Sequence, residues 1–525
     1  MKNIKISFSK KSILVVFLVL FQLLFFQIIY RNLKNYIYFD DSLELAQTAR
    51  NLLAGKGFTL NTYTYQGLDK VNKVVIQSGS WPNFQRFPLP VLILSGLFRI
   101  FGQGDQVITF SSVFFYFLIF PAMVWLAESF NFDLVTVIVA GLILITNSLV
   151  LNSSLIGQPE IAGMILYSLF LGLFLRRSGR KYSLIGFVAA LAYLNRFESI
   201  LWIIIFLFWF LVRNGKRDVS IKNLKKIVLV FTIVCFPWWI YVFSKTGNPF
   251  FSLQGAIGIP SGTRTYPNAL YAELEYIDPL KFVFTHPGEI FCKFIRYGRF
   301  FWQRFLVVSS ISHHLFLLFL FWLLKKQNEE EEAIKKPLVL SFSSVSLASI
   351  FFTPEPRYLL FFLPVIILLG TRSFFQLIER FKKNNFIFYF LLIGFFVILN
   401  TKNIFKYVSE MQAQNYYRYE KQELAELKNY LGKNSILISN LPRITGWYGE
   451  RKSLYLPKSP SDIDFVEKEY LKIDGIFVFS AKLHFLLPTW SLGWENILAD
   501  KPERINNYYL KAVFESGSLL YLKKE

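Results

Sequence analysis

The chain has 525 residues, of which 54% are hydrophobic and 59 are Phe, and its mean hydropathy is +0.40. This composition excludes a single soluble domain and indicates a polytopic membrane protein. The net charge of +22 does not indicate a nucleic-acid partner, because Lys and Arg gather at the ends of apolar runs. The two cysteines, Cys235 and Cys292, predict neither a disulfide framework nor a zinc site.

Apolar runs recur along the chain, and the first follows a basic N-terminus that includes Lys10 and Lys11. That first run lacks a small-residue cleavage site, so we expect a retained anchor. We predict about eleven spanning helices, some shorter than the roughly 20 residues of a straight span. They lie near residues 12–30, 107–128, 134–151, 160–175, 183–195, 199–212, 227–243, 304–324, 337–353, 358–371 and 386–403.

The apolar stretch 88–101 is ambiguous, because it is short and contains Pro88, Pro90 and Arg99. If it does not cross, five basic clusters fall on one side of the membrane, as the positive-inside rule requires. If it does cross, all but the N-terminal cluster move outside. We therefore predict an interfacial or half-buried helix, a multi-pass protein of the cell membrane and a cytoplasmic N-terminus.

This topology places the unusual polar motifs on the outer face, together with the C-terminal tail. The outer segments are residues 31–106, 152–160, 195–198, 244–303, 353–357 and the tail from about residue 404. It also predicts that positions 60 and 480 lie outside the cell and that position 220 lies in the cytoplasm.

The tail differs in character from the rest of the chain. Residues 406–431 show helical spacing of leucines, and residues 435–439 and 475–479 are typical of short buried strands. We therefore predict a membrane domain over residues 1–403 and a small extracytoplasmic α/β domain over residues 404–525.

The acidic pair Asp40-Asp41 follows the first apolar run and begins a helical pattern. Adjacent carboxylates at a bilayer edge are costly unless they face water, a metal or a substrate. An ionised carboxylate there can accept a proton from a hydroxyl group. The alternative is that Asp40 or Asp41 only caps the helix, although one acid would suffice for that.

Glu160 in Gly157-Gln158-Pro159-Glu160 is a second acid, at the start of a predicted spanning helix. With Asp40 it forms a candidate site for a divalent cation, Mg²⁺ or Mn²⁺, because these ions prefer oxygen ligands. The alternative is a carboxylate that simply stabilises the N-terminus of its helix.

Arginines at the outer rim are candidate phosphate ligands, because the guanidinium fork suits bidentate phosphate binding. Arg86, Arg196 and Arg357 lie in the three outer motifs. Arg357 either binds an anion or pairs with Glu355, and the alternative for Arg196 is a structural ion pair with Glu198.

Taken in order, these motifs resemble the C-type superfamily of integral-membrane glycosyltransferases, which includes the protein O-mannosyltransferases and the aminoarabinose transferase of lipid A. The resemblance covers roughly residues 12–403. Its motifs are Asp40-Asp41 with the helix that follows, Arg86-Phe87-Pro88-Leu89-Pro90, Gln158-Pro159-Glu160, Asn195-Arg196-Phe197-Glu198, and Arg357-Tyr358-Leu359-Leu360 with Pro364.

The resemblance implies inverting transfer of a sugar from a polyprenyl-phosphate donor to a lipid, glycan or protein acceptor outside the membrane. It implies that Asp40 is the base, that Glu160 is a second acid of the site, and that Arg86 and Arg357 bind the donor phosphate. Gln85 stands where metal-binding relatives often have an acid, so the cation is open to question. Two alternatives remain: a transporter or lipid flippase, and an oligosaccharide ligase with a diphosphate donor.

Overall fold

The computed structural model describes most of the chain. The described residues are 16, 19–27, 37, 40–70, 76, 81–176, 181–213, 217–267, 273–303, 313–325, 329–378, 417–480 and 492–524. The predicted span at 386–403, parts of the span at 12–30 and the domain boundary near residue 404 lie outside these residues.

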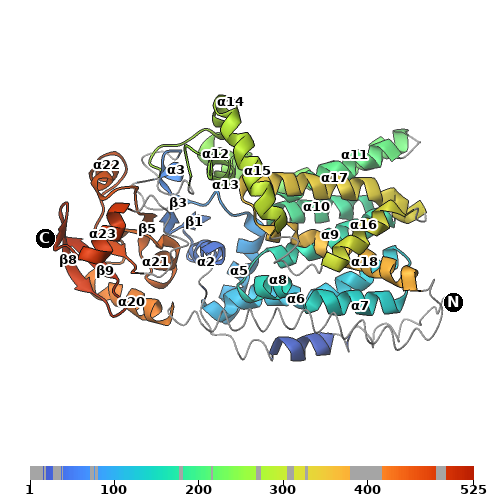
Figure 1. Cartoon of the computed structure of the whole chain (residues 1–525), viewed down its shortest axis with the longest axis horizontal. Helices are drawn as coiled ribbons and strands as arrows, with labels where there is room; N and C mark the ends of the chain where they lie inside the picture. Colours follow the sequence, from blue (N-terminus) through green and yellow to red (C-terminus); the bar gives the residue numbers. More distant parts are fainter. Residues whose placement is uncertain are drawn as a thin grey trace.

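One half of the molecule is a bundle of apolar helices that run in similar directions (Figure 1). The helices follow the predicted apolar segments, and Pro or Asn residues set several of their ends. They are α6 (Asp105–Ser129), α7 (Leu134–Ile145), α8 (Ser148–Leu155), α9 (Glu160–Leu175), α10 (Tyr182–Asn195), α11 (Ser199–Arg213), α12 (Arg217–Thr246), α16 (His313–Leu324), α17 (Glu329–Phe352), the 3₁₀ helix η4 (Pro356–Phe362) and α18 (Leu363–Ile378).

Four helical segments of the described chain are long and apolar enough to cross a membrane. They are Asp105–Ser129, Ile221–Thr246, Ile334–Phe352 and Arg357–Leu377. The pair α7 and α8 would be a fifth, and α9, α10 and α11 are apolar but shorter. These helices fit a multi-pass membrane protein, while the count of eleven spans stays a prediction.

The segment predicted as one span over residues 134–151 consists of two helices, which together are long and apolar enough for one broken span. Helix α7 ends at Ile145, and α8 starts at Ser148 with a bend of 55° between them. The side chain of Asn147 accepts hydrogen bonds from the backbone N–H groups of Leu149 and Val150, which begins a new helix. Hydropathy alone does not register such a cap.

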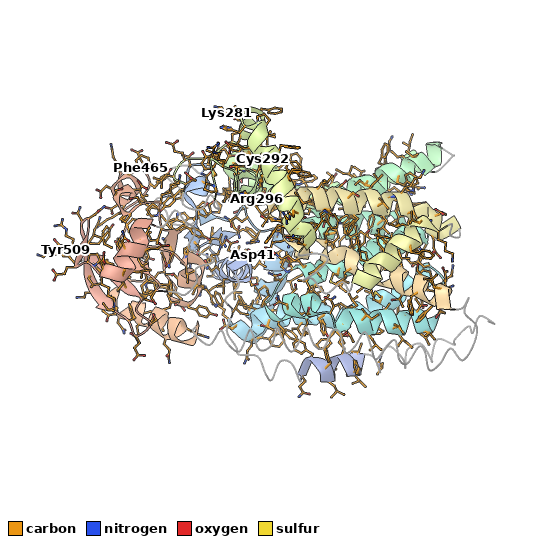
Figure 2. The ribbon with its side chains drawn as sticks, viewed as in Figure 1. Asp41, Lys281, Cys292, Arg296, Phe465 and Tyr509 are labelled. Carbon is orange, nitrogen blue, oxygen red and sulfur yellow. The ribbon has the colours of Figure 1, made fainter. Side chains whose placement is uncertain are left out.

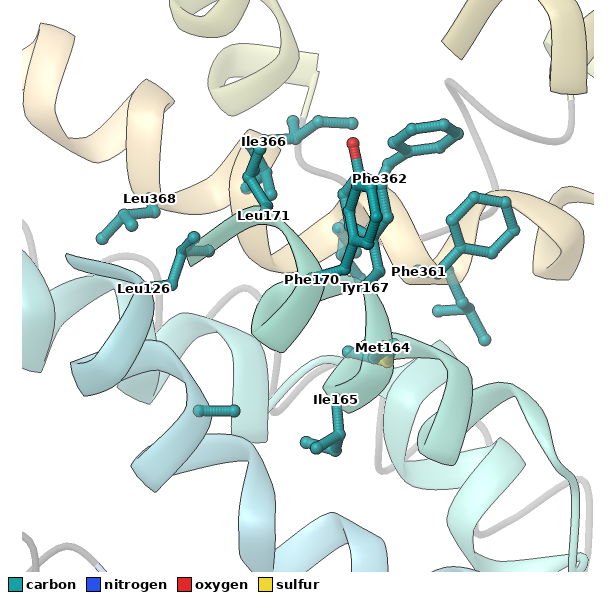
Figure 3. Packing of buried hydrophobic residues seen from close by; sticks show 14 of the residues in the cluster. Leu126, Met164, Ile165, Tyr167, Phe170, Leu171, Phe361, Phe362, Ile366 and Leu368 are labelled. Carbon is teal, nitrogen blue, oxygen red and sulfur yellow. The ribbon is translucent and has the colours of Figure 1, made fainter. Parts of the chain in front are cut away.

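Aromatic side chains fill the core of the bundle where α9 meets η4 (Figure 3). Tyr167 of α9 packs edge-on against Phe362 with 5.0 Å between ring centroids, and Phe361 lies 5.8 Å from the same ring. Such pairs add to the stabilisation from burial. The segment that begins with Pro356 and Arg357 is therefore fixed by the bundle core.

Short helices and strands lie between the bundle and the sheet domain described below, and we call this region the junction (Figure 1). Its helix α5 buries Val91, Leu94 and Phe98 and exposes Leu92 and Ile100, which agrees with the predicted half-buried helix. The junction elements are α2 (Asp40–Leu53), β1 (Thr59–Leu60), α3 (Tyr65–Leu68), β3 (Trp81–Pro82), α5 (Pro88–Phe101), α13 (Leu253–Gly258), α14 (Pro279–Thr285) and α15 (Pro287–Gln303).

The rest of the molecule is a domain built on a seven-stranded sheet in the order β2-β5-β4-β6-β9-β8-β7. The first four strands are parallel and the last three antiparallel. The strands are β2 (Thr62–Tyr63), β4 (Ile436–Ser439), β5 (Lys452–Tyr455), β6 (Gly475–Val478), β7 (Arg504–Ile505), β8 (Tyr508–Val513) and β9 (Leu519–Lys523). Its helices are α20 (Tyr417–Tyr430), α21 (Pro442–Tyr448), η6 (Pro460–Asp462), α22 (Ile463–Glu469) and α23 (Leu492–Asp500).

The strands predicted at 435–439 and 475–479 are confirmed as β4 and β6. The edge strand β2 comes from the early loop over residues 31–106, and it pairs in parallel with β5 of the tail. The early loop and the tail therefore share one sheet at one end of the bundle.

We predict that the sheet domain lies outside the cell. Leu60 is buried, so the exposed neighbour Lys56 is the better position to label. In a cysteine-free background, Lys56→Cys and Glu515→Cys should react with an impermeant thiol reagent added to intact cells, and Ser220→Cys only after lysis. Reaction of Glu515→Cys from the cytoplasmic side alone would contradict this topology.

Candidate functional site

Helix α2 carries the acidic pair at its first turn, where the helix dipole favours negative charge. Its apolar residues Leu43, Ala46 and Ala49 are fully buried, so this face of the helix is held in the junction. Asp40 is the first residue of α2, and its side chain lies outside the described part of the chain. The carboxylates of this helix that the structure describes are Asp41 and Glu44.

The Asp41 carboxylate is shared by two arginines that come from distant parts of the chain, and Figure 2 shows Asp41 in the junction. Its Oδ1 pairs with Arg86, and its Oδ2 lies 2.8 Å from Nη2 of Arg357. Burial by itself would raise the pKa of Asp41, but Arg86, Arg357 and Arg443 together hold that pKa well below its ordinary value. Asp41 is therefore ionised.

Local hydrogen bonds explain why Arg86 points toward α2. The side-chain oxygen of Asn83 accepts from the backbone N–H groups of Gln85 and Arg86, at 2.9 and 3.1 Å, which forms a tight turn. The amide of Asn83 in turn donates to the hydroxyl of Thr48 on α2, at 2.8 Å. The turn is thus attached directly to the helix whose acids it faces.

Glu44, one turn after Asp41, is buried between two further guanidinium contacts. Its Oε2 lies 2.5 Å from Nε of Arg86, and its Oε1 lies 2.6 Å from Nε of Arg443. The amide of Gln85 lies against the same carboxylate. Arg443 belongs to α21 of the sheet domain, so the tail reaches into the site.

Glu160, Arg196 and Glu198 form a second cluster beside the first. Arg196 pairs with Glu160 at 2.5 Å and donates two hydrogen bonds to Glu198, at 2.8 and 3.2 Å. The structural ion pair between Arg196 and Glu198 is therefore present, and it extends to Glu160 at the start of α9. Nη1 of Arg357 lies 3.7 Å from Glu160, which connects the two clusters.

Arg357 therefore faces Asp41 and Glu160. Pro356 starts η4 with its fixed φ, and this places Arg357 in the first turn, over the junction. The sequence left open whether Arg357 pairs with Glu355 or faces an anion. The sequence did not predict the ion pair with Asp41, and Glu355 is a further acid whose charge acts on Arg357.

A cavity of about 230 Å³ opens beside Asp41, and we call it the Asp41 cavity. Three arginines and one carboxylate are the charged groups that line it, and Glu44 behind this wall pairs with two of the arginines. Such a wall suits a phosphate or another anion. The lining residues are Asp41, Gln85, Arg86, Gln254, Ile257, Gly258, Ser261, Pro267, Tyr297, Phe352, Thr353, Arg357, Tyr358 and Arg443.

The described residues form no cluster of side chains that could bind a divalent cation. Among them, no three His, Cys, Asp or Glu side chains come together as metal ligands. Glu160 already binds Arg196, and a guanidinium on a carboxylate competes with a metal. The cation proposed for Asp40 and Glu160 depends on an Asp40 side chain outside the described residues, so no step is assigned to it.

Sequence reasoning missed two residues of this site, Glu44 and Arg443. Glu44 lies three residues after Asp41, and that spacing places both acids on one helix face, so a signal was present. Arg443 follows the carboxyl end of strand β4, where ligands often bind in sheets with parallel strands. Its meeting with α2 depends on tertiary packing alone.

Residues 85–241 match the family model described as dolichyl-phosphate-mannose-protein mannosyltransferase. ArnT from Cupriavidus metallidurans, solved with undecaprenyl phosphate, matches with a TM-score of 0.55 and 12% identity over 98% of each chain. The oligosaccharyltransferase AglB from Archaeoglobus fulgidus, solved with an inhibitory peptide and a dolichol-phosphate, matches with a TM-score of 0.54 and 10% identity, over 98% of this chain and 75% of AglB. No curated protein sequence matches this chain.

The buried Glu44 carboxylate predicts a large effect on stability. Glu44→Ala leaves Arg86 and Arg443 facing each other without their shared counter-charge, and breaking a buried pair costs about 3–5 kcal/mol. The melting temperature of the purified protein should fall clearly. Lys428→Ala, which removes an exposed pair with Glu450, should change stability by less than about 1 kcal/mol. Equal melting temperatures for the two variants would contradict the role of Glu44.

Proposed function

We propose that this chain, which has the fold of the C-type membrane glycosyltransferases, moves a sugar from a polyprenyl-phosphate donor to an acceptor hydroxyl at the outer membrane face. The fold and the family match support a membrane glycosyltransferase as the class of enzyme. The donor, the acceptor and the direction of transfer are the proposal.

The observation that carries this proposal is the arginine-lined wall of the Asp41 cavity. Arg86, Arg357 and Arg443 line this cavity together with Asp41, and Asp41 lies in the junction at the end of the apolar bundle (Figure 2). A lipid-linked phosphate has its charge where its hydrocarbon tail leaves the bilayer, so such a headgroup fits a cavity in this place. The structure of ArnT with undecaprenyl phosphate and that of AglB with a dolichol-phosphate agree with this donor class.

The proposed reaction is a single displacement. The acceptor oxygen forms a bond to the anomeric carbon while the bond from that carbon to the phosphate oxygen breaks. The proton of the acceptor hydroxyl passes to a carboxylate of the acidic pair, and polyprenyl phosphate leaves with its charge held by Arg86 and Arg357. One displacement inverts the anomeric centre.

Asp41 lines the cavity beside three arginines, and on this geometry we propose it as the base, whereas the family resemblance assigns the base to Asp40. The arginines lower the pKa of Asp41 against the effect of burial, which makes it a weak base at rest. A donor phosphate would compete for Arg86 and Arg357 and so raise the proton affinity of Asp41. Donor binding would then activate the base.

An oligosaccharide ligase with a diphosphate donor is the second candidate, and the match to the oligosaccharyltransferase AglB favours it over the remaining alternative. A transporter or flippase is disfavoured, because transporter sites usually lie near the midplane of the bundle. The Asp41 cavity lies instead at the end of the bundle.

Substitution of each acid separately should identify the base. Asp41→Asn should lower the turnover of a polyprenyl-phosphate-sugar donor by about 10²–10⁴-fold, because a positioned base contributes that much. Asp40→Asn should reduce it less. The reverse order in a purified assay would assign the base to Asp40, and near wild-type turnover in both variants would exclude the acidic pair as the base.

Arg357 should act on donor affinity. Arg357→Ala removes a charge-assisted contact of about 1.5–3 kcal/mol, which corresponds to roughly ten- to a hundredfold weaker binding of a polyprenyl-phosphate analogue. Arg357→Lys should restore binding only in part, because an ammonium lacks the planar fork. Arg372→Ala is the control. Arg372 of α18 pairs with Asp133, the residue before α7, and neither residue lines the Asp41 cavity. A loss of melting temperature in Arg357→Ala without a selective loss of affinity would show a structural role instead.

A further inference from the structure

Helix α21 of the sheet domain lies directly against α2, and four contacts with its backbone carbonyls fix it there. Gln47 donates to the carbonyl of Arg443 at 2.7 Å, and Arg50 donates to those of Gly446 and Trp447 at 2.8 and 3.1 Å. Thr62 donates to the carbonyl of Pro442 at 3.2 Å.

Gly446 shows how closely α21 approaches helix α2 and strand β2. A Cβ atom at this position would lie 2.5 Å from the Thr62 hydroxyl and 2.9 Å from the Gln47 amide, so only glycine fits without a shift. The backbone of α21 is therefore held in a defined place relative to the acids of α2.

The side chain of Arg443 projects from this fixed helix into the site. The residue is 5% exposed, its Nε binds Glu44 at 2.6 Å, and it lines the Asp41 cavity. Glu44 holds Arg86 on its other oxygen, and Arg86 holds Asp41. A continuous row of alternating charges thus leads from the sheet domain to the proposed base.

We propose that Arg443 is a positioning residue of the catalytic site, so that the sheet domain completes the site rather than merely covering it. This inference rests on the proposed function. Arg443 acts by fixing the Glu44 carboxylate, which in turn orients Arg86 toward Asp41, and by adding a third positive charge to the cavity wall.

The charges around Asp41 predict how the pH profile responds. The charged and titratable groups that face Asp41 are Arg86 from the turn after β3, Arg357 and Tyr358 from η4, Arg443 from α21 and, through Arg86, Glu44 of α2. Arg443 is one of the groups that lower the pKa of Asp41. Its removal therefore raises that pKa, and because the base must be deprotonated, the acidic limb of kcat, which reports the donor-bound enzyme, moves to higher pH.

The test uses the full-length protein with Arg443→Met, Arg443→Lys and Arg451→Ala. Arg443→Met should lower kcat/KM by about ten- to a hundredfold and move the acidic limb of kcat to higher pH. Arg443→Lys should keep the acidic limb near that of the wild type and recover part of the rate, because it keeps the charge and loses the fork.

Arg451→Ala is the matched control. Arg451 is also 5% exposed in the sheet domain, but it donates to the backbone carbonyl of Leu431 at 2.8 Å and does not line the Asp41 cavity. This variant should lower the melting temperature without moving the pH profile. If Arg443→Met behaves in the same way, or if Arg443→Lys loses activity only in proportion to its stability, the inference is overturned.

Titration of the wild type with undecaprenyl phosphate separates this inference from the function on which it rests. A wild-type protein that neither binds this lipid nor uses a polyprenyl-phosphate-sugar donor would overturn the proposed function. Binding and turnover by the wild type, with unchanged pH profiles in the Arg443 variants, would overturn only the role of Arg443.

Discussion

The rest of the site depends on one interaction, the sharing of the Asp41 carboxylate by Arg86 and Arg357. Each charge is mostly buried, and a buried charge without a partner is strongly destabilising. The three residues come from the start of α2, the turn after β3 and the first turn of η4, which are far apart in the sequence. Because each buried charge is stable only beside its counter-charge, the three segments come together at one end of the bundle. The cavity lies where they meet.

The same logic extends the network in both directions. Arg357 approaches Glu160, which binds Arg196, while Arg86 binds Glu44, which binds Arg443. Charged groups are thus already oriented before any ligand arrives, and an anion that enters meets donors that need little rearrangement. The aromatic core under η4 and the close packing of α21 on α2 provide the rigid support for this arrangement.

The membrane class, most helices and the strands β4 and β6 could be predicted from the sequence, because run length and periodicity are local properties. The sequence also predicted that the polar motifs come together, because the positive-inside rule assigns each of these turns to the same side of the membrane. The break before Ser148 was missed because a single Asn cap barely changes hydropathy. The ion pair of Arg357 with Asp41 and the place of Arg443 could not be predicted, because they depend on packing between segments separated by hundreds of residues.

The parallel pairing of β2 with β5 has a consequence for how the protein is made. The partner of Thr62 is Ser453, which is synthesised roughly 390 residues later, or about 20–80 s at ordinary rates of translation. During that interval the segment that forms β2 has no strand of the tail to pair with, and an unpaired edge is open to other chains. The sheet can be completed, and α21 can pack against α2, only after the tail has been synthesised. The first acids of the chain to be translated are thus among the last to reach their final surroundings, so assembly of the site is a late step that follows insertion of the bundle.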